Sequence, residues 1–160
     1  MKTRLAVPGD AEALAALISL AYRVEDFFKI GNRTDAAEVR EKMSSGVFIL
    51  LEDADRAIAG SVYVTAHGAV GYFGMLSIDP ARQGQGLGSR LVAAAEDYCR
   101  RAGCREMELE VVNLRTELPA FYARRGYVER GTRPFTDTER ASQRCHFIVM
   151  SKPLTPTVIG

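Results

Sequence analysis

The sequence predicts a single soluble domain of the α/β class. The chain has 160 residues, which is enough for one domain and too short for two comfortable ones. Strand-like runs joined by short turns fill residues 47–78, and the apolar period becomes that of a helix from residue 86. Hydrophobic residues make up 47% and charged residues 26%, an ordinary globular composition that excludes disorder for most of the chain.

The first part of the chain predicts one strand and two helices. Residues 3–6 form a short strand pattern, and Asp10 can cap the helix that follows it. That helix has one apolar stripe, because its apolar residues recur at the i, i+3, i+4 and i+7 spacing of a single helical face: Leu14, Leu17, Ile18 and Ala21. Thr34 offers a second cap before residues 35–43, whose weak apolar face predicts a partly exposed helix.

The middle of the chain predicts an antiparallel meander. Residues 47–51, 58–65 and 70–78 are strand-like, and turn residues at 53–56 and at His67-Gly68 separate them. Connections this short favour antiparallel neighbours, because a parallel pair needs a long crossover.

The second half predicts alternating helices and strands. Residues 86–102 carry one apolar helical face, and Gly103 stands where a helix commonly ends in a left-handed glycine. Residues 107–112 alternate as a strand does, and a short helix over 118–125 stops at Gly126. Two last strands are predicted at 127–130 and 146–150.

The polar stretch between those last strands, residues 131–144, is predicted to be a substrate-facing loop. With no repeat and no linker visible, residues 1–152 are predicted to form one domain and residues 153–160 a loose tail.

Composition limits the classes of partner and cofactor. A net charge of +1 gives no general attraction to nucleic acid or to a membrane surface. No apolar run approaches a bilayer span and no secretory signal is visible, so a cytoplasmic protein is expected. The cysteines are odd in number without a CxxC pair, and there are two histidines, which predicts reduced thiols and no metal site.

The most informative segment joins the predicted strand 70–78 to the helix that begins near residue 86. Gly84, Gly86 and Gly88 alternate in it, so the backbone can turn tightly and bring successive N–H groups close to a ligand. The first N–H groups of the following helix are unpaired and carry partial positive charge, which favours phosphate. The segment lacks the Gly-Lys-Ser/Thr ending of a P-loop, and the preceding meander argues against a Rossmann unit.

Two segments together resemble the GNAT superfamily of N-acetyltransferases. Gln83-Gly84-Gln85-Gly86-Leu87-Gly88 is similar to the acetyl-CoA loop of that family, Gln/Arg-x-x-Gly-x-Gly/Ala. Residues 121–127, Phe-Tyr-Ala-Arg-Arg-Gly-Tyr, resemble its later Phe-Tyr-x-x-x-Gly-Phe/Tyr segment. The resemblance covers nearly the whole chain and implies a mixed, mostly antiparallel sheet of about six to seven strands, splayed in the middle and flanked by about four helices.

The resemblance also implies how acetyl-CoA is held. Backbone at Leu76, Ser77 and Ile78 would pair with the pantetheine arm of the coenzyme. N–H groups would hold the pyrophosphate at Gln83, Gly84, Gln85, Gly86, Leu87, Gly88 and Ser89. Asn113 stands where relatives often have a coenzyme-contacting asparagine. Gln83 replaces an arginine that is frequent in the family, and Arg82 or Arg90 could supply that charge.

Acetyl transfer needs a neutral amine, a polarised carbonyl and a proton for the leaving thiolate. Tyr122 matches the family position that gives this proton, and a phenol of pKa ~10 suits a thiolate of similar basicity. Glu110 is the candidate base because it lies toward the end of the predicted strand 107–112, although Glu108 shares its face and both could simply face solvent.

The function expected from the resemblance is transfer of an acetyl group from acetyl-CoA to a primary amine of a small molecule or peptide, by direct attack in a ternary complex. A non-catalytic acetyl-CoA sensor or scaffold, or an enzyme using another acyl-CoA, remains as an alternative. Residues 35–43, Tyr72 and the 131–144 loop are expected to border the acceptor. Relatives commonly dimerise, so a homodimer is left open.

Overall fold

The structure is a computed structural model that describes residues 1–135 and 141–155. One seven-stranded sheet runs through it in the order β1-β2-β3-β4-β5-β7-β6. The strands are β1 (Lys2–Leu5), β2 (Val47–Glu52), β3 (Ile58–His67), β4 (Val70–Ile78), β5 (Glu106–Val112), β6 (Val128–Pro134) and β7 (His146–Pro153). The helices are α1 (Ala11–Ala21), α2 (Ala36–Lys42), α3 (Leu87–Arg101) and α4 (Leu118–Ala123), with 3₁₀ turns η1 (Pro8–Asp10), η2 (Tyr22–Glu25) and η3 (Pro80–Arg82).

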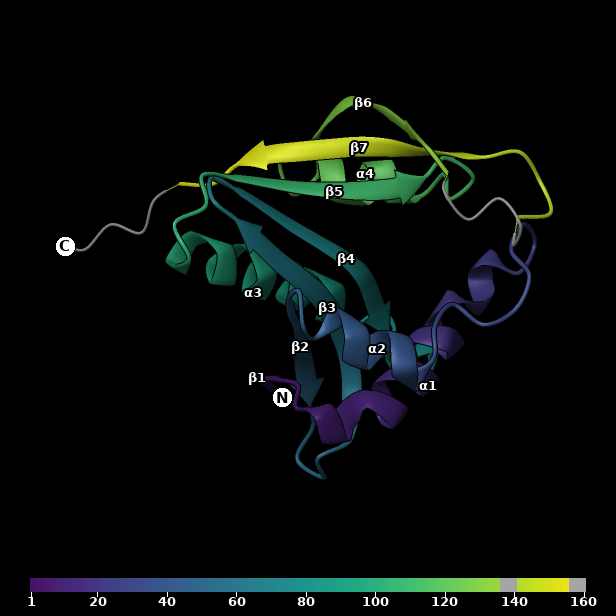
Figure 1. Cartoon of the computed structure of the whole chain (residues 1–160), viewed down its shortest axis with the longest axis vertical. Helices are drawn as coiled ribbons and strands as arrows, with labels where there is room; N and C mark the ends of the chain where they lie inside the picture. The colour runs from purple at the N-terminus through teal and green to yellow at the C-terminus, as the bar shows by residue number, and fades with distance from the viewer. Residues whose placement is uncertain (136–140, 156–160) are drawn as a thin grey trace.

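The sheet opens in its middle. All neighbouring strands are antiparallel except β4 and β5, which pair in parallel. That pair is short and ends at Tyr72 opposite Glu108, and beyond this point the two strands diverge (Figure 1). The predicted fold class is confirmed: a mixed, mostly antiparallel, splayed sheet with four helices.

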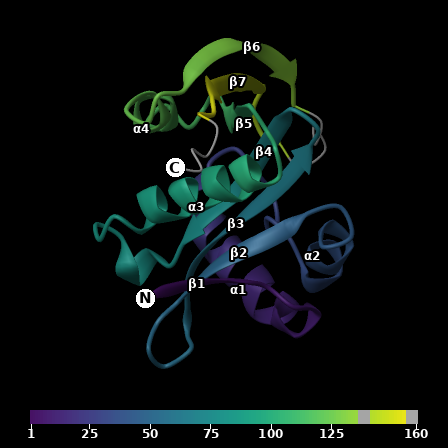
Figure 2. The same ribbon diagram turned by 90° about the vertical axis from the view of Figure 1, so that its left-hand side faces the viewer.

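The helices cover both faces of the sheet (Figure 2). α1 and α2 pack on one face, where Leu14, Ile18 and Val39 join strand residues of β2 and β3 in one core cluster. α3 lies on the other face with Leu91 at zero exposure, and Tyr122 of α4 belongs to the same cluster. The apolar stripes that the sequence predicted for α1 and α3 therefore face the sheet.

Two helix starts differ in detail from the prediction. Asp10 precedes α1 but its side chain does not cap that helix, because its carboxylate accepts from the Val7 N–H and pairs with Arg4. Asp35, not Thr34, caps α2 by accepting a hydrogen bond from the Glu38 N–H at 2.8 Å. The Thr34 hydroxyl instead donates to the Glu38 carboxylate at 2.8 Å.

The C-terminal part is more regular than predicted. β6 continues to Pro134, so its end occupies the beginning of the predicted 131–144 loop. Residues 136–140 of that loop and residues 156–160 of the predicted tail lie outside the described residues. Pro153 pairs with Glu106 and Leu154 is buried, so the boundary predicted after residue 152 lies within β7. No helix in the described ranges is both long and apolar enough to cross a membrane.

Candidate active site

The site begins at the turn that joins β4 to α3. Gly84 has φ +83° and Gly86 has φ +73°, backbone conformations that residues with a Cβ rarely adopt. Within the described part of the chain, backbone N–H groups of residues 83–89 donate to no other backbone group. This turn therefore presents successive free donors at the positive end of a long helix, as the sequence predicted.

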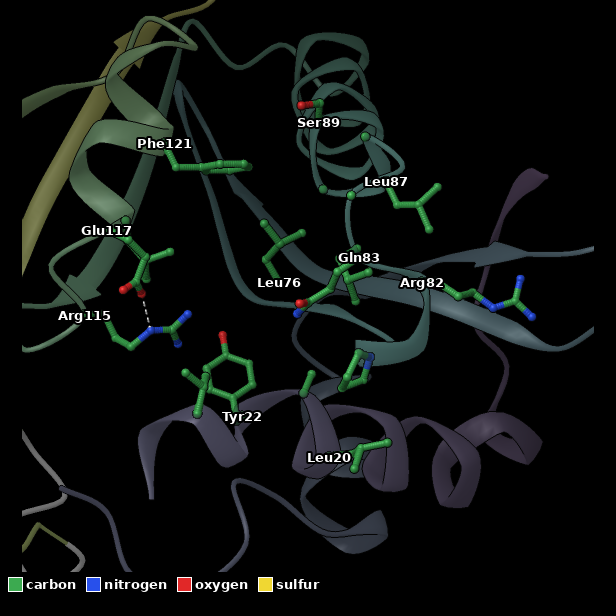
Figure 3. A pocket seen from close by; sticks show the side chains of 18 of the residues that line it. Leu20, Tyr22, Leu76, Arg82, Gln83, Leu87, Ser89, Arg115, Glu117 and Phe121 are labelled. Atoms are coloured by element: carbon green, nitrogen blue, oxygen red, sulfur yellow. Dashed lines mark hydrogen bonds and ion pairs between the residues drawn. The ribbon is translucent and has the colours of Figure 1, made fainter. Parts of the chain in front are cut away.

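A cleft of about 800 Å³, called the outer cleft below, runs beside this turn between α3, α4 and the end of α1 (Figure 3). Most of the predicted coenzyme residues line it: Leu76, Ile78, Gln83, Gly84, Gly86, Leu87, Gly88 and Ser89. Gln85 does not line it. Ser77 is buried, and its hydroxyl donates to the Met75 carbonyl at 2.9 Å, so its side chain is occupied within β4.

The positive charge beside the turn comes from Arg125. Its guanidinium donates to the Ser89 hydroxyl and stacks on the Phe121 ring, with 3.6 Å between the guanidinium carbon and the ring centroid. Arg125 Nε is buried without a hydrogen-bond partner, so a donor is available at the start of α3. Of the two arginines that the sequence suggested, Arg82 lines the outer cleft but pairs with Asp53, and Arg90 lies outside the cleft and donates to the Met1 carbonyl.

A second cavity of about 120 Å³, the inner cavity, occupies the gap between β4 and β5. Both predicted catalytic residues, Tyr122 and Glu110, line it, together with Tyr72. The inner cavity and the outer cleft share wall residues, namely Tyr22, Leu76 and Leu118, so they adjoin. The splay of the sheet thus brings the cavity of Tyr122 next to the cleft at the glycine turn.

Tyr122 is held in a cluster of aromatic rings. It is 5% exposed, and its ring lies edge-on to Phe121, Phe73 and Tyr127 with centroids 5.0, 5.8 and 6.0 Å away. Its hydroxyl forms no hydrogen bond within the described ranges. Burial raises the pKa of this hydroxyl well above its ordinary value, because a buried phenolate is poorly solvated. The side chain therefore keeps its proton at neutral pH.

Glu110 faces the inner cavity while paired with an arginine from the neighbouring strand. Arg133 of β6 places Nη1 2.7 Å from Glu110 Oε1 and Nη2 2.7 Å from Glu108 Oε1. Both glutamates are therefore in contact with the same guanidinium. The sequence placed Glu108 and Glu110 on one strand face and could not distinguish them as candidate bases. In the structure Glu110 lines the inner cavity and Glu108 does not.

Asn113 is not brought to either cavity. Its carbonyl oxygen accepts from the His146 N–H at 2.8 Å, and its own N–H donates to the His146 carbonyl at 2.9 Å. These bonds join the end of β5 to the start of β7, so the structure gives Asn113 a role in closing the sheet and no place in the cleft.

Two residues of the outer cleft gave no signal in the sequence. Tyr22 of η2 points into the outer cleft opposite the glycine turn, and Arg115 lies beside it, joined to Glu117 (Figure 3). Arg115 is also held by Glu25, with 2.9 Å between Nη1 and Oε2. Phe121, the first residue of the family-like segment 121–127, both packs on the core and lines the cleft. Only contacts between distant segments bring these residues together.

Metal-binding groups do not gather in the described ranges, where no three His, Cys, Asp or Glu side chains are placed to hold an ion. Cys99, Cys104 and Cys145 are free thiols. Burial, reinforced by Cys104, raises the pKa of the Cys99 thiol to about 12, which keeps it protonated.

The chain matches the model of the Acetyltransferase (GNAT) family over residues 15–127. This match covers more than half of the chain, which therefore belongs to that family and confirms the resemblance inferred from the two segments.

Sequence relatives include glucosamine 6-phosphate N-acetyltransferase 1 of Oryza sativa subsp. japonica, 34% identical over 79 residues. That alignment covers 46% of this chain and 46% of the relative. A probable glucosamine 6-phosphate N-acetyltransferase 2 of the same plant is 35% identical over 69 residues, which cover 43% of this chain and 40% of the relative. The chain thus spans less than half of the length of these curated relatives.

Solved structures match over nearly the whole chain at low identity. The ribosomal-protein-S18-alanine N-acetyltransferase from Escherichia coli has a TM-score of 0.78 at 18% identity, covering 99% of this chain and 97% of that one. A GNAT superfamily phosphinothricin acetyltransferase from Sinorhizobium meliloti, in complex with AcCoA, has a TM-score of 0.73 at 17% identity, covering 98% and 90%. At these identities the likeness establishes a shared fold.

Proposed function

We propose that the protein is an N-acetyltransferase that moves an acetyl group from acetyl-CoA to a primary amine of a small molecule or peptide. One observation carries the proposal: the glycine turn at residues 83–89, whose N–H groups donate to no backbone group of the described residues, borders a cleft that adjoins the cavity of Tyr122.

The outer cleft suits the coenzyme. Its glycine turn offers backbone donors for a pyrophosphate, and Arg125 adds a cation with an unpaired Nε. On its other side β4 pairs with β3, but beyond Tyr72 the edge of β4 that faces β5 pairs with no strand of the described residues. Backbone at Leu76, Ser77 and Ile78 can therefore pair with an extended pantetheine arm along this edge. The arm would then lead the thioester from the outer cleft into the inner cavity.

The inner cavity suits the chemistry. Glu110 removes a proton from the acceptor ammonium, directly or through water, and the neutral amine attacks the thioester carbon. The carbon–sulfur bond breaks, and the Tyr122 hydroxyl donates its proton to the departing thiolate. The attacking nitrogen loses its second proton as the amide forms, and this proton restores the Tyr122 hydroxyl through water. Burial raises the pKa of Tyr122, so its hydroxyl carries a proton before each turnover but is a weaker acid than the free phenol whose pKa matched the thiolate.

The activity is tested by thiol release from acetyl-CoA with a panel of amines. The panel includes glucosamine 6-phosphate, which the names of the rice relatives carry, and a peptide with a free N-terminus. Release that requires an amine supports the proposal. A protein that binds acetyl-CoA in calorimetry and releases thiol with no member of a broad panel would instead be a sensor or scaffold, and propionyl-CoA tests the other acyl donor.

Tyr122→Phe tests the donor assignment. We expect kcat to fall by about 10²–10⁴-fold, the usual contribution of a positioned acid, with acetyl-CoA affinity retained because the ring stays. Steady-state kinetics and calorimetry measure the two quantities. Tyr98→Phe on α3, at a tyrosine that lines neither cavity, is the matched control. Unchanged kcat in the Tyr122 variant would remove the residue from the mechanism.

A further inference from the structure

Arg33 lies where three cavities meet on the side of the inner cavity away from the glycine turn. It lines the inner cavity and a neighbouring cavity of about 530 Å³, here called the side cavity, which α2 borders through Glu38, Glu41 and Lys42. It also lines a third cavity of about 230 Å³ beside η2. A cation at this junction can reach any molecule that enters the inner cavity from the side of α2.

The Arg33 guanidinium has no anionic partner in the described ranges. Its one contact there is with the Tyr22 ring, 5.1 Å from guanidinium carbon to ring centroid. The two arginines that contact carboxylates of the inner cavity are paired, Arg115 with Glu25 and Arg133 with Glu110. A guanidinium carries five donors in a planar fork that fits the two oxygens of a carboxylate or phosphate. The N–H donors of Arg33 are therefore available to an anionic ligand.

No carboxylate of the described residues forms an ion pair with Arg33. In the inner cavity, Glu25 contacts Arg115 and Lys29, and Glu110 contacts Arg133. In the side cavity, Glu38 accepts from Thr34 and Glu41 faces water. Asp26, in the third cavity, is exposed as well. None of these carboxylates forms an ion pair with Arg33, so its guanidinium remains available to an anion that enters the junction.

The positive charge of Arg33 lies close to the reaction centre. Tyr72 lines the same inner cavity as Tyr122, and the nearby positive charge of Arg33 opposes the rise in the pKa of Tyr72, which burial and Glu110 raise to about 12. Phe135 and Phe147 line both the inner and the side cavity. An acceptor whose amine reaches Tyr122 thus passes aromatic walls and extends toward Arg33.

We propose that Arg33 binds an oxyanion of the acceptor, so that the preferred substrate is an amine that also carries a carboxylate or a phosphate. This inference rests on the proposed acetyltransferase function and defines its acceptor class. The guanidinium fixes the anionic end of the molecule, and the aromatic walls hold the connecting atoms, so that the amine is directed toward Glu110 and the thioester.

The test compares matched amines with and without the anion. O-phosphoethanolamine is paired with ethanolamine, and β-alanine with β-alaninamide, in thiol-release assays on the full chain. We expect kcat/KM to be higher for the anionic member of at least one pair. Arg33→Gln should lower that value by about 10- to 100-fold, the share of a charged hydrogen-bonded contact, and leave the neutral partner unchanged.

Arg101→Gln provides the control for loss of one positive charge. Arg101 is exposed at the end of α3, pairs with Asp97 and lines neither the outer cleft nor the inner cavity. It should leave the preference for anionic amines intact. Equal kcat/KM for charged and neutral members of both pairs, or an Arg33→Gln variant that keeps the preference, would overturn the proposal while leaving the acetyltransferase function standing.

Calorimetry tests the oxyanion site at Arg33 independently of the acetyltransferase function, because it measures binding without turnover. The same amines are titrated into the protein saturated with CoA, in the native chain and in Arg33→Gln. Binding that needs both the anion and Arg33, without thiol release from acetyl-CoA, would preserve the oxyanion site and refute the transferase function. Absence of anion-dependent binding in an active enzyme would refute the oxyanion site alone.

Discussion

At the scale of single residues, burial decides which chemistry a side chain can offer. Tyr122 and Tyr72 line the same small cavity, and burial is the largest cause of the raised pKa of each hydroxyl. Both therefore enter a reaction as proton donors. A base must come from elsewhere in the cavity, and the carboxylates that line it are Glu25, bound to Arg115, and Glu110.

Glu110→Gln tests the base, with Glu108→Gln as its matched control. The two glutamates share one strand face and the same partner, Arg133 at 2.7 Å, but Glu110 alone of the pair lines the inner cavity. We expect kcat to fall by about 10²–10⁴-fold in Glu110→Gln and to stay near the native value in Glu108→Gln. Steady-state kinetics with a saturating amine measures both.

The comparison also has a contrary outcome. Equal losses in the two variants would mean that the glutamates act by holding Arg133 in place. No loss in Glu110→Gln would move the base to another group, such as ordered water.

At the scale of elements, α3 carries two left-handed glycines in unlike surroundings. Gly86, with φ +73°, precedes its first turn and lines the outer cleft; Gly103, with φ +91°, follows its last turn and lines no wall of that cleft. A Cβ at either would meet no atom within 4 Å, so the cost of a substitution is backbone strain in both. The two ends of α3 differ in one respect: acetyl-CoA is proposed to approach the backbone at Gly86, and no ligand is proposed at Gly103.

Gly86→Val and Gly103→Val use this symmetry. Each should lower the free energy of unfolding by roughly 1–2 kcal/mol, the cost of a left-handed residue with a Cβ. Only Gly86→Val should also weaken acetyl-CoA binding, because its side chain stands where phosphate must approach the N–H groups. Denaturant unfolding measures the first effect and calorimetry the second. Equal affinities in the two folded variants would show that the glycine turn does not hold the coenzyme.

Elements with a strong local pattern could be predicted, and those without one could not. α3 could be predicted because Leu91 and Ala95 recur on one helical face and Gly103 stands where the helix ends. β6 continues beyond the predicted strand. The sequence did not predict its end because all seven of its residues are exposed, so no alternation of apolar and polar residues marks where the strand stops. Asn113 was assigned to the coenzyme by motif position, whereas its amide is used by the His146 backbone, a pairing that no local pattern encodes.

At the scale of the whole molecule, the site exists because the sheet comes apart. The glycine turn was visible in the sequence, but the passage from it to Tyr122 depends on β4 and β5 separating after Tyr72. Arg115 reaches Glu25 across 90 positions of sequence, and this pair ties η2 to the region before α4. Such contacts are set by the packed fold. The sequence pattern therefore predicted the glycine turn and placed Tyr72 and residues 35–43 on the acceptor side, but it gave no sign of Tyr22 or Arg115.

The buried tyrosines also predict how the whole molecule responds to alkali. Burial raises the pKa of Tyr72, Tyr122 and Tyr127, and of the Cys99 thiol. In the unfolded chain the thiol ionises near ~8.5 and the phenols near ~10, while the folded protein keeps these protons. The folded state then binds more protons, so stability is full below these values and falls as pH rises toward the folded pKa values of about 12 for Tyr72 and Cys99.

We therefore expect the free energy of unfolding to decline gently above pH ~8.5 and steeply above ~10, by about 1.4 kcal/mol per pH unit for each buried tyrosine. Guanidinium unfolding followed by circular dichroism between pH ~8 and ~11 measures the curve. Tyr72→Phe should flatten the steep limb by one tyrosine's share and leave the gentle limb, which Cys99 causes, unaltered. A curve that stays level through pH ~10 would mean that these hydroxyls reach solvent, and Tyr122 would then lose the protected proton on which its role as donor depends.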